Sequence, residues 1–155
     1  MNHDIWTIIF DNLDLKHQIM LKMANKQFYE FNITNLYDNR SRKITNNIID
    51  KLPHLKSLNL YDNIDVKNID NLTSLTKLDI SGSCVISDIS HLENLIYLKM
   101  NNNYRIKQIP KSVKYLEICG NCIVTPDDIK DLKLIKLNTY LNTQFENSYV
   151  YNSTF

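Results

Sequence analysis

The chain has 155 residues, of which 43% are hydrophobic, and its 18 basic and 17 acidic residues leave a formal net charge of +1. This length suits one domain, or one domain with a short appendage, and the hydrophobic content suffices for a packed core, which excludes global disorder. The balanced charge gives no electrostatic reason to expect nucleic acid or a membrane surface as a partner.

Residues 4–32 have the pattern of three short helices. Apolar residues recur at helical spacing on two sides of the first predicted helix: Ile5, Trp6, Ile9, Phe10 and Leu13. A second helix is predicted to begin at Asp14 and a third to run through residues 26–31. A segment this small rarely folds alone. Because an uncovered apolar stripe usually marks a binding surface, we expect this segment to contact another protein.

The same segment resembles the F-box family, whose motif runs L-P-x-E-I-x-x-x-I-F-x-x-L-D-L and continues to C/V-x-K-x-W/F. Matching positions within residues 1–32 are Met1, Asp4, Ile5, Ile9, Phe10, Leu13, Asp14, Leu15, Lys26 and Phe28. Asn2 replaces the usual Pro and Asn25 the usual Cys. The resemblance implies docking on a Skp-type protein within a cullin–RING ubiquitin ligase. The docking residues would be Ile5, Trp6, Ile9, Phe10 and Leu13.

Residues 33–51 are expected to form an irregular first repeat or linker. The letters NLYDN at 35–39 recur at 59–63, so the first repeat is predicted to begin near Ile33. Its loop half, SRKITNNIIDK, is longer than the corresponding part of the later repeats.

Residues 52–138 contain a repeat of about 20 residues, which is a signature of repeat proteins. One apolar column reads Leu58, Leu78, Leu98, Leu116 and Ile135. A second column, two residues later, reads Leu60, Ile80, Met100, Ile118 and Leu137. A polar column follows three residues after the second one, at Asn63, Ser83, Asn103 and Asn121.

This periodicity resembles the leucine-rich-repeat family, L-x-x-L-x-x-L-x-L-x-x-N. In L-x-L, alternate side chains of a short strand point into the core. The Asn can satisfy backbone groups where the chain leaves the strand. Stacked copies then share a core that no single repeat could bury. Short repeats leave little room for helices, so extended segments or 3₁₀ turns are expected opposite the strands.

The sequence therefore predicts an α+β fold. A three-helix F-box-like segment (1–32) would precede a leucine-rich-repeat solenoid with a short parallel sheet on its concave face. The repeats would span 52–138 after the 33–51 linker, and residues 139–155, which are aromatic and β-prone, would form a C-terminal cap or tail.

The candidate substrate-binding residues lie beside the inward-pointing strand leucines and are expected on the concave face. They are Asn59, Tyr61, Lys77, Asp79, Tyr97, Lys99, Tyr115, Glu117 and Lys136. Tyrosine combines a large contact area with a polar tip and is enriched in binding hot spots. The alternative is an ordinary solvated strand surface.

No catalytic, metal or cofactor site is expected. The CGNC segment, Cys119 to Cys122, lacks the two further ligands that a structural zinc site needs. Three cysteines without a signal peptide do not indicate a disulfide framework. The four histidines are scattered, and no G-x-S-x-G, P-loop or H-E-x-x-H motif is present.

Together these features predict a non-enzymatic, substrate-recruiting adaptor of a cullin–RING ubiquitin ligase. Its partners would be a Skp-type adaptor with its cullin and an unidentified protein substrate, with neither nucleic acid nor membrane. One alternative is a repeat module unconnected to ubiquitin, whose N-terminal helices merely cap the core; another is a decoy that binds the Skp-type protein but recruits no substrate.

A cytoplasmic or nuclear location is expected, because no apolar run approaches the roughly 18 residues of a membrane helix. The Asn-, Ile- and Lys-rich composition suggests an AT-rich genome, and the chain resembles compact F-box proteins of large DNA viruses and protists. A viral source would place the protein in the host cytoplasm.

Overall fold

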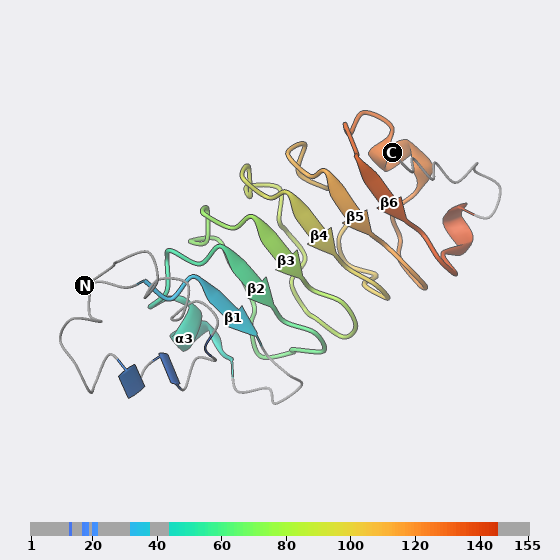
Figure 1. The fold of residues 1–155 in the computed structure, drawn as a ribbon. Helices are drawn as coiled ribbons and strands as arrows, with labels where there is room; N and C mark the ends of the chain where they lie inside the picture. Colours follow the sequence, from blue (N-terminus) through green and yellow to red (C-terminus); the bar gives the residue numbers. More distant parts are fainter. Residues whose placement is uncertain (1–12, 14–16, 19, 22–31, 38–43, 146–155) are drawn as a thin grey trace.

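The structure, a computed structural model, describes residues 13, 17, 18, 20, 21, 32–37 and 44–145. These residues contain one six-stranded parallel sheet in which each strand pairs with the next along the chain (Figure 1). The strands are β1 (Asn35–Tyr37), β2 (Ser57–Asn59), β3 (Lys77–Asp79), β4 (Tyr97–Lys99), β5 (Tyr115–Glu117) and β6 (Lys136–Asn138). The helices are α3 (Asn46–Ile49), α4 (Pro126–Ile129) and the 3₁₀ helix η2 (Thr143–Phe145).

Each repeat forms one coil of a solenoid, as the repeat pattern predicts. The middle residues of β1 to β5 point into the core: Leu36, Leu58, Leu78, Leu98 and Leu116 are at most 1% exposed. Leu137 of β6 is partly buried and packs against the same core. Register pairs Leu58 with Leu78 and Leu78 with Leu98, so identical side chains stack along the solenoid axis. Each coil is therefore stabilised by a core that it shares with its neighbours and could not bury alone.

The expected α+β fold class, a three-helix segment followed by a leucine-rich-repeat solenoid, is wrong. The described residues form a parallel β-solenoid whose α-helices, α3 and α4, have four residues each. In a coil of about 20 residues the return path closes with tight turns, such as Leu72 N to Ile69 O (3.0 Å) and Leu75 N to Leu72 O (3.1 Å), which leave no length for a longer helix. Of the predicted N-terminal helices, only residues 17, 18, 20 and 21 are described as helical, and most of the segment lies outside the described residues.

The alignment of the last repeat was wrong by two residues. Leu137, and not Ile135, is the register partner of Leu116 on β5. Ile135 is 54% exposed, so it does not belong to the core column. The last repeat is longer than its neighbour (137−116=21 residues, against 116−98=18), and it contains α4 within its return path. Because this return path is longer, the last strand begins later than a fixed repeat of about 20 residues predicts.

The polar column also differs from the sequence prediction. Asn63 and Asn103 of the predicted column are buried, but Ser83 and Asn121 are exposed, and Cys84 and Cys122 take the buried positions in their coils. Asn142 is the buried residue of the last coil. Asn103 Nδ2 donates to Ile80 O (2.9 Å), and its Oδ1 accepts from the backbone amides of Arg105 (2.9 Å) and Ile106 (3.3 Å). A thiol replaces the amide in alternate coils, where Cys122 Sγ contacts Met100 O at 3.1 Å.

The alternation between a buried asparagine and a buried cysteine originates in the turn just before that position. In each coil this turn contains one residue with positive φ: Asp62, Gly82, Asn102, Gly120 and Leu141. In the glycine coils an additional residue separates the turn from the buried position, so Cys84 lies two residues after Gly82, whereas Asn63 directly follows Asp62. Asp62 Oδ1 accepts from Ser83 N (2.9 Å). The solenoid therefore has a structural period of two repeats at this edge.

Candidate functional site

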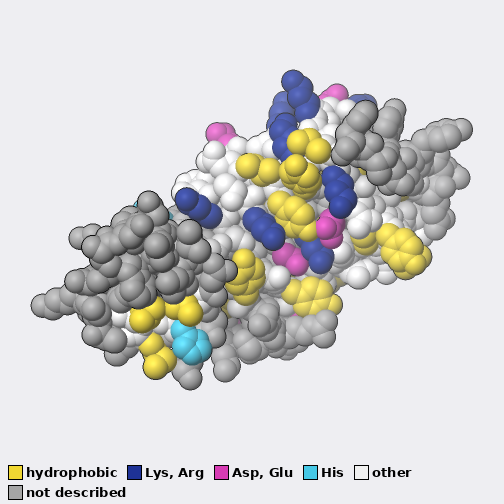
Figure 2. All heavy atoms as spheres, in the orientation of Figure 1, with side chains coloured by type: hydrophobic (Ala, Val, Ile, Leu, Met, Phe, Trp, Pro, Cys, Tyr) yellow, Lys and Arg dark blue, Asp and Glu magenta, His cyan; other side chains and the backbone are white. Residues whose placement is uncertain are grey.

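The side chains on the outer side of the sheet form an ordered surface, which we call the strand face. It consists of the residues that flank the buried middle residue of each strand: Asn35, Tyr37, Ser57, Asn59, Lys77, Asp79, Tyr97, Lys99, Tyr115, Glu117, Lys136 and Asn138. Parallel strands lie about 4.8 Å apart, so six strands give a surface about 24 Å long. Figure 2 shows hydrophobic side chains over the middle of this face, interspersed with lysines and carboxylates.

A network across three strands organises the centre of the strand face. Lys77 Nζ lies 5.1 Å from the centroid of the Tyr97 ring. The Tyr97 hydroxyl donates to Glu117 Oε1 (2.5 Å), and Lys99 Nζ lies 3.9 Å from Glu117 Oε2. Burial raises the pKa of Tyr97, and the hydrogen bond to Glu117 raises it further. The hydroxyl therefore stays protonated and remains a donor throughout the neutral range.

The second carboxylate of the strand face is also engaged. Asp79 Oδ2 accepts from Asn59 Nδ2 (3.3 Å), and Asp79 Oδ1 accepts from the backbone amide of Ser81 (3.0 Å). Such turn-forming hydrogen bonds of an Asp side chain hold the backbone as the chain leaves the strand. Both acidic side chains on this face thus have partners within the protein.

The structure places the nine predicted recognition residues together. Eight lie on β2 to β6, and Tyr61 follows β2 by two residues. Their role in binding stays a prediction. Of the predicted docking residues, Ile5, Trp6, Ile9 and Phe10 lie outside the described residues, while Leu13 is described and half-buried.

Sequence reasoning missed three residues that immediately precede strands. Ile96 is 46% exposed, Ile135 is 54% exposed, and Lys114 is half-buried between them in the same column. The L-x-L alternation says nothing about this position. The sequence did contain a signal for it. The same position holds the polar residues Lys56 and Thr76 in the earlier repeats, which indicates that it lies at the surface.

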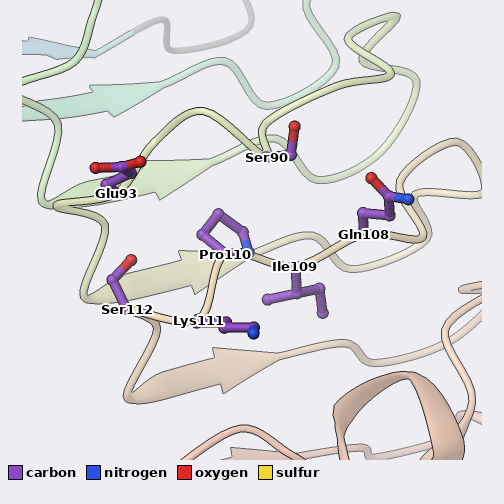
Figure 3. Close-up of a pocket in the computed structure, with 7 residues that line it drawn as sticks. All are labelled: Ser90, Glu93, Gln108, Ile109, Pro110, Lys111 and Ser112. Atoms are coloured by element: carbon purple, nitrogen blue, oxygen red, sulfur yellow. The ribbon is translucent and has the colours of Figure 1, made fainter.

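A groove of about 510 Å³ lies between two return paths of the solenoid (Figure 3). It is lined by Ser90, Glu93, Gln108, Ile109, Pro110, Lys111 and Ser112. The repeat is shorter here: Val113 is four positions after Ile109, whereas in the preceding repeat Leu95 is six positions after Ile89. Ser112 Oγ donates to the Leu92 carbonyl (3.3 Å).

The three cysteines have the properties of structural residues. All are free thiols, with Cys84 and Cys122 buried and Cys119 half-buried. Burial raises the pKa of Cys84 to about 11, and it also raises the pKa of Cys119 and of Cys122. A raised pKa leaves little thiolate at neutral pH, and thiolate is the reactive form. Within the described residues, no group of three or more His, Cys, Asp or Glu side chains could hold a metal ion.

Thiol alkylation tests this description. We expect Cys84 in the folded protein to react with iodoacetamide at pH 8 at least about tenfold more slowly than Cys119, because it is both buried and protonated. Peptide mass spectrometry measures the two rates, with the denatured chain as the control in which they converge. Equal rates in the folded state would contradict the assignment.

The Cys84 thiol also predicts a pH dependence of stability. The folded protein favours the neutral thiol, so its contribution is complete below the unfolded pKa of about 9 and is lost as pH rises through about 11. The free energy of unfolding should therefore fall more steeply with pH over this range in the parent than in Cys84→Ala. Parallel curves in urea denaturation would show that burial of the thiol does not control this titration.

The fold and its surface define a class: a parallel β-solenoid that presents a sheet face of aromatic and charged side chains. Comparisons with protein-family models, curated proteins and solved structures found no match. In the part of the chain that the structure describes, no helix has the length and apolar character needed to cross a membrane.

Proposed function

We propose that this chain is a non-enzymatic, protein-binding repeat module that presents its strand face to a partner protein. The observation that supports this most is the in-register array of tyrosine and lysine side chains on β3 to β6. Tyr97 pairs with Tyr115 across adjacent strands, and Lys77 precedes them on β3 in the same row. Tyrosines with exposed polar tips are frequent anchors of protein interfaces.

The rigidity of the scaffold also supports binding. The strand backbones are hydrogen-bonded to neighbours on both sides in β2 to β5, and the underlying leucines are fully buried. Binding therefore requires little ordering of the backbone, which reduces the entropic cost of association. The surface is about 24 Å long, which is sufficient for a peptide or for part of a folded partner.

Site-specific photo-crosslinking tests this proposal. A benzophenone amino acid replaces Tyr115 on the strand face in one variant and Lys67, an exposed loop residue, in the matched control. We expect a discrete protein adduct from position 115 and none from position 67 in cells of the source organism or its host. Adducts of equal yield at both positions, or from position 67 alone, would place binding elsewhere.

The finer form of the proposal is the adaptor role in a cullin–RING ubiquitin ligase. It is supported by the match of residues 1–32 to the F-box motif, of which Trp6 and Phe10 would contact the Skp-type protein. One observation favours the alternative, a cap. Leu21 is partly buried and packs against the hydrophobic core of the solenoid, as a capping segment would.

Co-purification with a Skp-type protein separates these two roles. The adaptor role predicts that the Skp-type protein retains the parent chain and binds Trp6→Ala/Phe10→Ala at least about tenfold more weakly. Burial of each of the two side chains in the interface would contribute about 1.5–3 kcal/mol to binding. Met20→Ala, at an exposed position of the same segment, is the matched control. Thermal unfolding checks that each variant is folded. No retention of the folded parent would refute the adaptor role and leave the cap.

A further inference from the structure

We propose that the strand face binds an extended acidic segment of its partner, in which carboxylates alternate with apolar side chains. The binding surface, which we call the lysine–tyrosine patch, consists of Lys77, Ile96, Tyr97, Lys114, Tyr115 and Lys136. This inference rests on the proposed function and specifies the chemistry of the partner.

The patch has an apolar centre on β4 and β5. Tyr97 and Tyr115 are register partners, and Ile96 directly precedes Tyr97. The backbone amide of Lys114 donates to Ile96 O (2.9 Å), which places Lys114 beside Ile96 in the preceding column. Ile96 is 46% exposed and Tyr115 is 37% exposed. Figure 2 shows hydrophobic side chains in the middle of the view with basic side chains, in dark blue, close to them.

The charges around this centre are not balanced. Lys77 and Lys136 are exposed and Lys114 is half-buried, and among the described residues none of the three forms an ion pair with a carboxylate. The two acidic side chains of the strand face are in contrast engaged, Glu117 by Tyr97 and Lys99 and Asp79 by Asn59 and a backbone amide. The unmatched charge of the patch is therefore positive, although the whole chain carries only +1.

The dimensions fit an extended segment that crosses the strands. From Lys77 on β3 to Lys136 on β6 there are three strand spacings, or about 14 Å. Residues i and i+4 of an extended peptide point to the same side and lie about 13 Å apart. Two carboxylates at this separation could reach the two lysines, and the apolar side chain between them would lie over the two tyrosines.

A protein segment fits better than a nucleic acid. The low net charge of the chain provides no extended positive field for a continuous phosphate backbone. The exposed Ile96 side chain is complementary to an apolar group. Carboxylates on such a segment would bind at the rim, where complementary charges increase both association rate and specificity.

Fluorescence anisotropy with labelled peptides tests this inference. The probe is Ser-Glu-Ser-Leu-Ser-Glu-Ser-Phe-Ser-Glu-Ser, which in an extended conformation places carboxylates at i and i+4, with an apolar side chain between them, on one side. In one control every acidic residue is Lys, and in a second control Leu and Phe are replaced by Ser. We expect only the first peptide to bind, with an affinity that falls about tenfold between low salt and about 0.3 M salt as screening increases. A labelled oligouridylate serves as the nucleic-acid probe.

Charge-reversal variants locate the binding. Lys114→Glu/Lys136→Glu should weaken probe binding about tenfold or more, whereas Lys51→Glu/Lys67→Glu, with the same change in net charge at exposed loop residues, should change it less than about twofold. Tyr115→Ala should weaken it in the same direction as the patch variant. Circular dichroism and thermal unfolding confirm that all variants are folded.

The outcomes separate the inference from the proposed function. Preference for the lysine peptide, tighter binding of the oligouridylate, equal weakening by the two double variants, or no binding of the acidic probe would overturn the acidic-segment inference. If position 115 still crosslinks to a partner, the protein-binding function stands with a partner of different chemistry. If the crosslink fails as well, both are wrong.

Discussion

Replacing Asn103 by alanine should destabilise the protein by about 2–4 kcal/mol, because it leaves several buried backbone groups without hydrogen-bond partners. The Asn103 side chain bonds the Ile80 carbonyl and the amides of Arg105 and Ile106, and it is fully buried. Alanine leaves these groups without a partner where water has little access. The side chain connects one coil to the previous one, so its loss weakens the stack and not only one turn.

The matched control is Asn121→Ala. By sequence alone Asn121 occupies the same column as Asn103, but its side chain is exposed and Cys122 takes the buried position. We expect Asn121→Ala to change the free energy of unfolding by less than about 0.5 kcal/mol. Urea denaturation at a fixed temperature measures both variants. Similar losses for the two asparagines would contradict the alternation of amide and thiol.

The second large effect is expected for Gly82→Ala, at about 2–4 kcal/mol. Gly82 has φ of +75°, a left-handed conformation that costs other residues about 1–2 kcal/mol. A Cβ atom there would lie 2.1 Å from Asp62 Oδ1, well inside contact distance. Asp62 cannot simply move away, because Oδ1 accepts the amide of Ser83. The substitution therefore combines backbone strain with a collision and the loss of a hydrogen bond between coils.

A double-mutant cycle separates these contributions. In Asp62→Gly the colliding carboxylate is absent, and glycine tolerates the φ of 55° found at this position. Gly82→Ala in this background should cost only the backbone strain, about 1–2 kcal/mol, which leaves a coupling energy of about 1–2 kcal/mol between the two sites. Ser83→Ala, at an exposed neighbouring residue, controls for changes of side chain in the same turn. Additive losses would show that the collision is relieved at no cost.

These two predictions bear on function because the turns hold the strand face. Asp62 and Gly82 follow the strands that end at Asn59 and Asp79 by three residues each, and the Asp62 amide donates to Ser81 O (3.0 Å), which joins neighbouring coils. A variant that loosens this edge should therefore also weaken binding at the strand face, whereas the exposed control residues should not. The peptide assay on Gly82→Ala, performed below its unfolding temperature, measures that coupling.

The sequence by itself determined the repeat, the solenoid and the central core positions. Leu58, Leu78, Leu98 and Leu116 recur close to every 20 residues and are all buried, because a regular apolar period can be satisfied only if successive coils stack in phase. The short period also allowed the prediction that extended segments or tight turns return the chain. The grouping of Lys77, Tyr97 and Tyr115 on one face followed from strand alternation.

Tertiary structure alone decided the features that depend on how one coil meets the next. The letters NLYDN suggested that Leu36 corresponds to Leu60, but register pairs it with Leu58, and Leu137 displaces Ile135 from the core in the same way. The expected α+β fold class was wrong, because the short return paths leave no length for longer helices. A sequence column records the order of residues along one chain, whereas register and burial depend on the number of residues in each return path. An additional residue in a turn, such as Ser83, exchanges a buried asparagine for a buried cysteine without disturbing the period.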